Sequence, residues 1–282
     1  TGSVRNQGIE LALNFENTWR NFTWMSGLTY SMNKNKIESL ADNVINPITG
    51  QLFSIPSLDM GGYADLRFIL REGGSMGDLY SRTDLRRDAN GAIYMDESNN
   101  VYTQKIDNPD SYIKLGSVLP KGNLAWRNNF MWKNFHVGFM ISARLGGVVF
   151  SRTQAILDKF GVSEASADAR DNGFVLINGN DRVNPENWYT TVGSTAVPQY
   201  YTYSATNVRL QEASIGYTIP RKWLANVCDI KVSLIGRNLW MIYNKAPFDP
   251  EAVASTDNFY QGIDNFMMPS LRNVGFSLNF KF

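Results

Sequence analysis

The chain ends in a run of alternating apolar and polar side chains. Over residues 271–282, every second side chain is apolar: Val274, Phe276, Leu278, Phe280 and Phe282. The side chains between them are polar or small. Successive side chains of a β-strand point to opposite faces, so the segment predicts one strand with an apolar face and a wet face. Because the run stops on an aromatic residue of the apolar face, it favours the closing strand of a membrane β-barrel over a strand of a soluble sandwich.

The same alternation recurs in eight earlier segments, at residues 8–16, 22–33, 63–71, 75–86, 124–132, 135–145, 206–219 and 229–242. In the segment 206–219 the apolar parity changes, which predicts a β-bulge near Gln211 and Glu212. The apolar faces carry no charged residue, and Asn128 is their main polar exception. A lipid bilayer demands this, since a Lys or Arg at mid-membrane costs about 2–4 kcal/mol. A soluble core would exclude charges equally well.

The connections between these segments alternate between short and long. Those at 19–21, 72–74, 133–134 and 220–228 are short, and those at 41–60, 87–120, 146–205 and 243–270 are long. Outer-membrane barrels have short periplasmic turns and long extracellular loops. The predicted fold class is therefore all-β: an antiparallel transmembrane β-barrel sector of about nine strands. Open sheet edges do not occur in a bilayer, so we expect the sector to belong to a larger barrel. Arg127, Arg144 and Arg237 fall on the polar parity and are predicted to face the lumen.

Composition agrees with this interpretation. The 282 residues are 43% hydrophobic with a mean hydropathy of −0.27, and no run approaches the roughly 18 apolar residues of a spanning helix. Seven Trp suit the aromatic girdles of a membrane interface. A net charge of +1 gives no reason to expect a nucleic-acid partner. The single Cys228 excludes an intrachain disulfide and is expected to be a packed thiol.

The sequence offers little for catalysis. The one histidine, His136, lies on a wet face with no Ser and Asp in a triad-like arrangement, so we expect a hydrogen-bonding role. The acidic pairs lack the spacing of a calcium or zinc site. We expect no enzyme, no metal and no cofactor.

Several motifs resemble the SusC/RagA family of TonB-dependent outer-membrane transporters. They are NQGIEL at 6–11, NKNKI at 33–37, REGGSMG at 71–77, LGSVLP at 115–120, VRLQEASIGYTIP at 208–220, GRNL at 236–239, FDPE at 248–251 and MPSLR at 268–272. Each motif is weak alone, but their order and spacing cover nearly the whole chain.

The resemblance implies a 22-stranded barrel plugged by an N-terminal domain. It also implies coupling to the TonB complex and a SusD-like surface lipoprotein that closes the extracellular mouth. Residues 1–282 would be the C-terminal portion of that barrel, in the outer membrane of a Gram-negative bacterium, with the plug and the TonB-contacting segment absent. The terminal aromatic ladder Phe276, Leu278, Phe280 and Phe282 would then be the signal read by the barrel-insertion machinery.

Candidate contacts to a substrate or to the lid lie in the long loops. They are Asp181, Arg182, Asn184, Trp188, Tyr189, Tyr201, Asp249 and Glu251. Aromatic faces beside amides and carboxylates bind sugar rings, but they also grip peptides, contact partner proteins or simply pack a loop. For Asp249-Pro250-Glu251 a turn that fixes the loop is the simpler interpretation. The favoured function is import of an oligosaccharide. A peptide importer of the same family, and a scaffold or adhesin that never transports, remain as alternatives.

Overall fold

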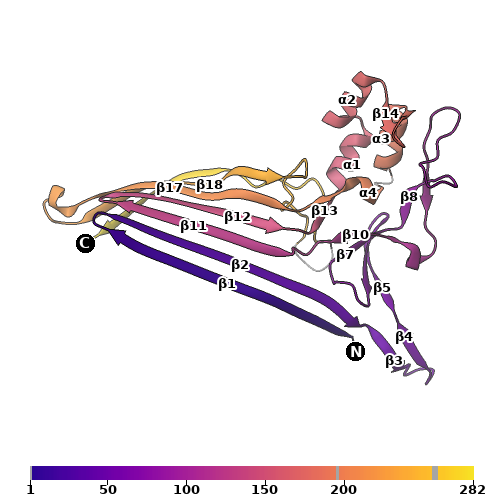
Figure 1. The fold of residues 1–282 in the computed structure, drawn as a ribbon, viewed down its shortest axis with the longest axis horizontal. Coiled ribbons are helices and arrows are strands. Elements are labelled where there is room, and N and C mark those ends of the chain that lie inside the picture. Colours follow the sequence, from indigo (N-terminus) through magenta and orange to yellow (C-terminus); the bar gives the residue numbers. More distant parts are fainter. Residues whose placement is uncertain (1, 195–196, 256–259) are drawn as a thin grey trace.

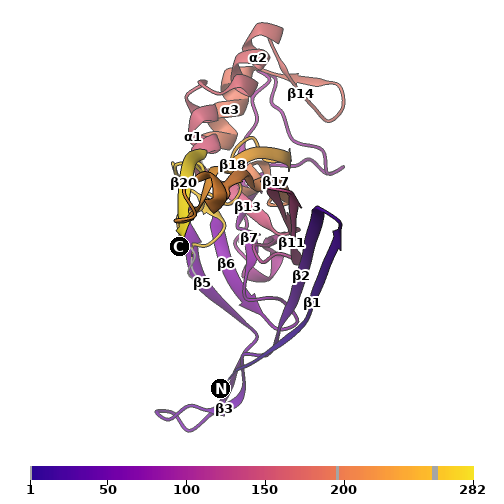
Figure 2. The same cartoon turned by 90° about the vertical axis from the view of Figure 1, so that its left-hand side faces the viewer.

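A long antiparallel sheet dominates the computed structural model, which describes residues 2–194, 197–255 and 260–282. Its strands, in spatial order, are β1 (Ser3–Trp19), β2 (Phe22–Ser39), β11 (Gly122–Trp132), β12 (Phe135–Leu145), β17 (Asn207–Ile219), β18 (Asp229–Asn244) and β20 (Asn273–Lys281). The sheet arches into a trough that is open along β1 and β20 (Figures 1 and 2). The predicted antiparallel all-β class is confirmed.

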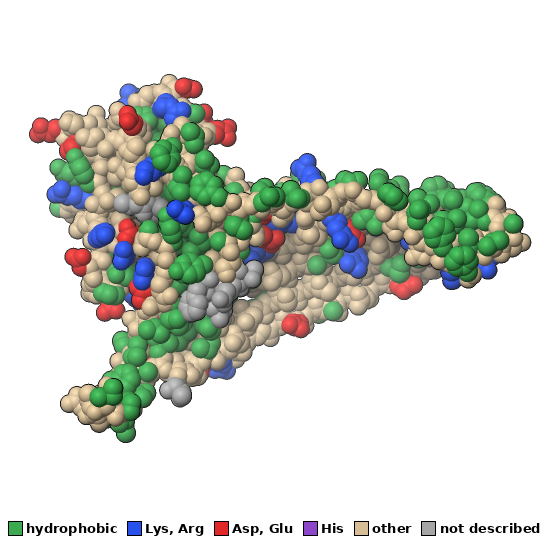
Figure 3. Space-filling view, turned by 180° about the vertical axis from the view of Figure 1, so that it is seen from behind, with side chains coloured by type: hydrophobic (Ala, Val, Ile, Leu, Met, Phe, Trp, Pro, Cys, Tyr) green, Lys and Arg blue, Asp and Glu red, His purple; other side chains and the backbone are tan. Residues whose placement is uncertain are grey.

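The register gathers the apolar side chains on one face. One continuous row runs across the sheet through Leu13, Leu28, Trp126, Ile141, Leu210 and Trp240. Seen from behind, charged side chains lie along the hollow of the trough, and hydrophobic ones gather where the short turns are (Figure 3). The sheet therefore has one apolar and one polar face, as the alternation predicts.

Aromatic residues cluster near the short turns. Trp19, Phe22, Trp132, Phe135 and Tyr217 occupy one row, and the rings of Phe135 and Tyr217 are 4.8 Å apart. This row corresponds to the aromatic girdle expected at a membrane interface.

Two local predictions on this sheet are confirmed. The register shifts between Leu210 and Glu212, so Gln211 is the extra residue of the predicted bulge. The polar exception Asn128 is buried, and its side-chain oxygen accepts a hydrogen bond from the Trp24 indole at 3.0 Å. The Trp24 N–H thus provides a hydrogen-bond partner for the Asn128 side-chain oxygen on the apolar face.

The prediction of about nine strands in one sheet is wrong for two of them. The segments predicted at 63–71 and 75–86 form β6 (Leu66–Arg71) and β7 (Asp78–Ser81), but these join a separate sheet, ordered β10 (Ile113–Ser117), β7, β6, β5 (Ser57–Tyr63). Both faces of β6 and β7 are largely buried against other loops, so their apolar residues serve a local core rather than the apolar face of the long sheet. Strand β2 pairs directly with β11.

The Gly73-Gly74 link is consequently misplaced in the prediction. Its backbone exchanges hydrogen bonds with Ile37 near the end of β2, on the side of the long connections. Residues 40–121 thus form one long connection. The alternation survives with seven strands: connections 20–21, 133–134 and 220–228 lie at one end, and 40–121, 146–206 and 245–272 lie at the other (Figure 1).

The connections of the second end build a compact outer region. Its helices, all in 152–201, are α1 (Arg152–Lys159), α2 (Glu164–Asn172), α3 (Pro185–Ser194) and α4 (Pro198–Tyr201), which we call the helical cap. Its short strands are β13 (Val148–Ser151), β14 (Val175–Ile177), β15 (Asp181–Val183), β16 (Thr202–Ser204) and β19 (Ile263–Asp264). Hairpins β3 (Ala41–Ile45) with β4 (Leu52–Ile55), and β8 (Thr83–Leu85) with β9 (Thr103–Lys105), complete it.

A main hydrophobic core joins the three long connections. Leu66, Phe68, Phe150, Val192 and Ile263 are among its buried members, and Val192 belongs to the cap. In the part of the chain that the structure describes, no helix is both long enough and apolar enough to cross a membrane.

Candidate functional site

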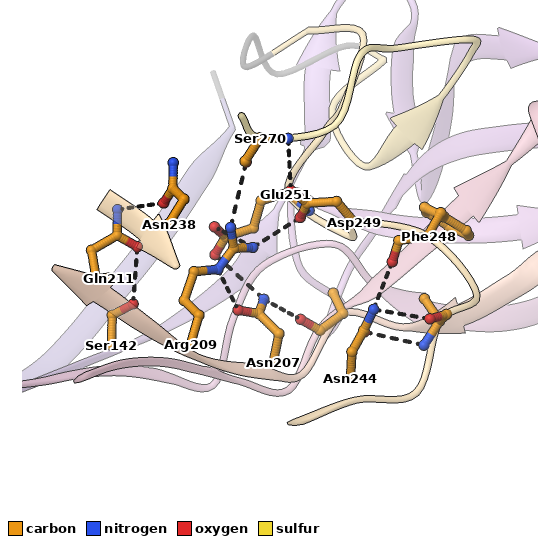
Figure 4. A network of polar contacts seen from close by, with 12 residues as sticks. Ser142, Asn207, Arg209, Gln211, Asn238, Asn244, Phe248, Asp249, Glu251 and Ser270 are labelled. Atoms are coloured by element: carbon orange, nitrogen blue, oxygen red, sulfur yellow. Dashed lines mark hydrogen bonds and ion pairs between the residues drawn. The ribbon is translucent and has the colours of Figure 1, made fainter. Parts of the chain in front are cut away.

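A buried arginine organises the polar face where the long sheet meets the outer region. Arg209 lies on β17, and its guanidinium contacts Asp249 at 2.8 Å and Glu251 at 2.9 Å (Figure 4). The side chains of Arg209 and Asp249 are only 5% and 8% exposed. Arg209 also donates to the side-chain oxygens of Asn207 at 3.2 Å and Ser270 at 3.4 Å. The cluster joins strand β17 of the long sheet to both ends of connection 245–272.

Asp249 holds the two ends of connection 245–272 together. Its carboxylate accepts backbone N–H bonds from Glu251 and from Ser270, both at 3.1 Å. Burial by itself opposes ionisation, but the hydrogen bonds from Ser270 and Arg209 outweigh it and hold the pKa of Asp249 below its ordinary value. The carboxylate is therefore ionised at neutral pH. This geometry supports the loop-fixing interpretation of Asp249-Pro250-Glu251.

The same connection is fastened to the helical cap. Strand β19 pairs in parallel with β13, and the buried Asp264 accepts a hydrogen bond from the Ser151 hydroxyl at 2.6 Å. Ser151 also caps α1 by accepting from the Gln154 backbone N–H. Connection 245–272 thus links the wall strand β17 to the first helix of the cap.

A cavity of about 330 Å³ lies beside the arginine cluster. Its lining includes Arg209, Phe248, Asp249 and Arg272. Aromatic, cationic and anionic side chains meet there, which gives it the means to bind a polar ligand.

The predicted contact residues of the cap have local structural partners. Asn184 accepts backbone N–H bonds from Glu186 and Asn187, so it caps the start of α3. Arg182 lies over the Phe174 ring at 4.3 Å, and Asp181 accepts from the Asn178 amide. Tyr189 donates to the Ala165 carbonyl and borders a second cavity of about 330 Å³. Asp181 and Arg182 are exposed, and their contact role stays a prediction.

Two of the predicted aromatics pack inward. Trp188 is half-buried, touches two hydrophobic clusters and meets the Tyr200 ring edge-on at 5.4 Å. Tyr201 is 1% exposed. A surface contact is therefore the wrong assignment for Tyr201, because the hydrophobic core of the outer region covers its ring.

The predicted lumen residues occupy the polar face. Arg127 and Arg237 share a row with Glu212, and Arg237 pairs with Glu212 at 3.2 Å. Arg144 lies closer to the cap and donates to the Val118 carbonyl at 2.7 Å. The wet-face position of His136 also agrees with the prediction, since its ring lies 2.9 Å from the Thr218 hydroxyl.

The terminal ladder is open to its surroundings. Phe276, Leu278, Phe280 and Phe282 are 50–84% exposed on the described chain. Their role in barrel insertion stays a prediction. Cys228 is a buried free thiol, as expected.

The sequence reasoning missed Arg209 and Ser270 as site residues. Arg209 was visible as a charged residue within the VRLQEASIGYTIP run, and Asp249 and Glu251 as an acidic pair in another quoted motif. The available signal was charge: a basic Arg209 and an acidic pair at Asp249 and Glu251 would each need an oppositely charged partner if they were buried. Across the described ranges, the acidic, His and Cys side chains form no cluster of three or more that suits a metal ion.

Comparison with known proteins places the chain among receptors. No protein-family model matches it. It is 26% identical, over an alignment of 311 residues, to TonB-dependent receptor P3 of Formosa agariphila, and equally to TonB-dependent receptor P26 of that bacterium. The alignments cover all of this chain and 29% of each relative. The chain is therefore similar to one part of two TonB-dependent receptors. Both relatives are receptors and not enzymes, in agreement with the expectation from the sequence.

Solved structures are similar to this chain in fold. The RagAB peptide importer matches over the whole chain in its closed-closed state, with a TM-score of 0.67 and 17% identity, and in its open-open state, with a TM-score of 0.69 and 16% identity. The matches cover 30% and 29% of those chains. At this identity the likeness concerns the fold.

Proposed function

We propose that residues 1–282 are the C-terminal portion of the barrel of a SusC/RagA-type transporter that imports an oligomeric nutrient. The observation that carries the proposal is the match of the whole chain to TonB-dependent receptors. The long sheet supports it, because one face is continuously apolar and the other carries Arg127, Glu212 and Arg237. A wall between lipid and a watery passage needs these two faces.

The lengths of the connections support a membrane orientation. Short turns face the periplasm and the outer region faces the outside of the cell, so the apolar face lies in the outer membrane of a Gram-negative bacterium. The seven strands leave open edges along β1 and β20. The remainder of the barrel would cover both, since a bilayer does not tolerate open edges.

The partners belong to the whole transporter. A SusD-like lipoprotein would close over the outer region, and the TonB complex would act through a plug and TonB-contacting segment outside these residues. The barrel-insertion machinery would read the terminal ladder. RagAB, whose fold is similar, is described as a peptide importer. For this receptor the oligomer is an oligosaccharide or a peptide.

The test is uptake by the intact parent transporter. The gene is deleted in its own bacterium, and import of labelled oligosaccharide and oligopeptide pools is compared with that of the complemented strain, with and without a protonophore. Energy-dependent import that returns on complementation, together with co-purification of a lipoprotein, would support the proposal. Normal import of every pool in the deletion strain would contradict it, and favour the scaffold or adhesin alternative.

A further inference from the structure

A cavity of about 760 Å³ lies between two sheet edges at the base of the helical cap. All five residues of β10, Ile113 to Ser117, line it, and so do all three residues of β16. Side chains of alternate residues point to opposite faces of a strand, so a wall made of consecutive residues is a strand edge rather than one face. The cavity is therefore bordered by backbone as well as by side chains.

Both strands end their sheets. Strand β10 is the outermost of β10-β7-β6-β5, and β16 is the outermost of β16-β13-β19. Within the described residues no strand pairs with the second side of either. An end strand presents unpaired N–H and C=O groups along its free side, and an extended peptide can pair with them as an added strand. Five residues of β10 offer about 17 Å of such edge, enough for a short peptide.

The charge of the lining favours an acidic ligand. Lys114 and Lys121 line the cavity, and no Asp or Glu does. Lys114 is compensated, because its ammonium lies 2.5 Å from the buried Asp78 carboxylate. No acidic side chain pairs with Lys121 among the described residues, and its stem packs on Gly146, where an added Cβ would lie 2.7 Å from Lys121 Cγ. Lys121 is thus held at the cavity with its charge available to a carboxylate.

We propose that this cavity binds an extended acidic oligopeptide, whose backbone pairs with the free edge of β10 and whose C-terminal carboxylate meets Lys121. The proposal rests on the proposed import function and names its substrate class. A sugar chain has no row of N–H and C=O groups at the strand repeat, so the edge of β10 distinguishes the two oligomers. Cavities of this size are typical of ligand sites.

The experiment measures binding to the purified full-length parent by calorimetry. The probes are a set of acidic peptides of about five residues with a free C-terminus, the same peptides amidated, the same peptides methylated on alternate backbone nitrogens, and oligogalacturonate. Methylation removes donors and blocks the approach of a strand, so it should weaken binding about tenfold or more. Amidation should weaken binding severalfold.

Matched lysine variants assign the effect to the cavity. Lys121→Gln should abolish the preference for the free carboxylate and leave binding of the amidated peptides unchanged. Lys159→Gln, on an exposed helix position outside the cavity, should keep the preference of the parent. Both side chains are exposed, so neither change threatens folding.

Two outcomes would overturn the inference. The first is equal affinity for methylated and unmethylated peptides, which excludes strand addition. The second is binding of oligogalacturonate with no binding of any peptide. This outcome is compatible with the import proposal but excludes a peptide as the substrate. Failure of the import proposal looks different, since the deletion strain would then import every pool normally.

Discussion

Replacing Arg209 should release connection 245–272 from the wall of the long sheet. Arg209→Met keeps the length of the side chain and removes its charge, which leaves the Asp249 carboxylate buried without its cation. Breaking a buried ion pair from one side costs about 3–5 kcal/mol. Glu251 is 40% exposed and can turn to water, so we take the lower end, about 3 kcal/mol.

This loss should appear as local opening. Each 1.4 kcal/mol is tenfold in an equilibrium constant, so about 3 kcal/mol predicts roughly a hundredfold faster amide hydrogen exchange at the backbone N–H groups of Glu251 and Ser270. The measurement is hydrogen exchange with mass spectrometry on the intact parent, at matched folded abundance. Exchange at Ile263 and Asp264 should change less, because β19 is also held by β13.

The control is Arg237→Met on the neighbouring strand. Its pair with Glu212 is 65% and 36% exposed, and exposed pairs contribute about 0–1 kcal/mol. Exchange in connection 245–272 should therefore stay within about fivefold of the parent. If Arg209→Met and Arg237→Met changed this connection equally, or neither changed it, the argument that the buried cluster fastens the connection would be refuted.

Three further predictions concern the sheet and the cluster. Leu28→Arg should sharply lower the folded abundance of the parent, by the lipid-face cost of about 2–4 kcal/mol, whereas Thr29→Arg on the polar face should be tolerated; equal damage would mean the faces are misassigned. Phe280→Ser with Phe282→Ser should reduce the heat-modifiable barrel in the outer membrane, and unchanged abundance would remove the assembly role. The pKa of Asp249 is depressed in the folded state, so its stabilisation is present above the ordinary carboxyl pKa of about 4 and is lost as pH falls through the depressed value. Exchange of the connection should rise at that acidic step, and Asp249→Asn should abolish the step; a step that persists in this variant would assign it to another group.

Local periodicity was enough to predict each strand of the long sheet. The side chains of a strand alternate with a period of two. The apolar alternation in 22–33 or 135–145 therefore predicts both the strand and the side chains that lie on its apolar face. The bulge at Gln211 was visible for the same reason, since an extra residue reverses the parity. The resemblance motifs added the family, which the comparison with known receptors confirms.

Pairing and burial were decided only by the tertiary structure. Residues 66–71 alternate like a membrane strand, yet β6 packs into the core of the outer region, because which strand pairs with which depends on contacts far apart in sequence. The same holds for Tyr201, whose ring the core covers. Arg209 and Asp249 stand 40 residues apart, and only the return of connection 245–272 to β17 makes them one cluster. Sequence periodicity is local and reports which side chains share a face, whereas an ion pair or a sheet edge exists only after distant segments meet.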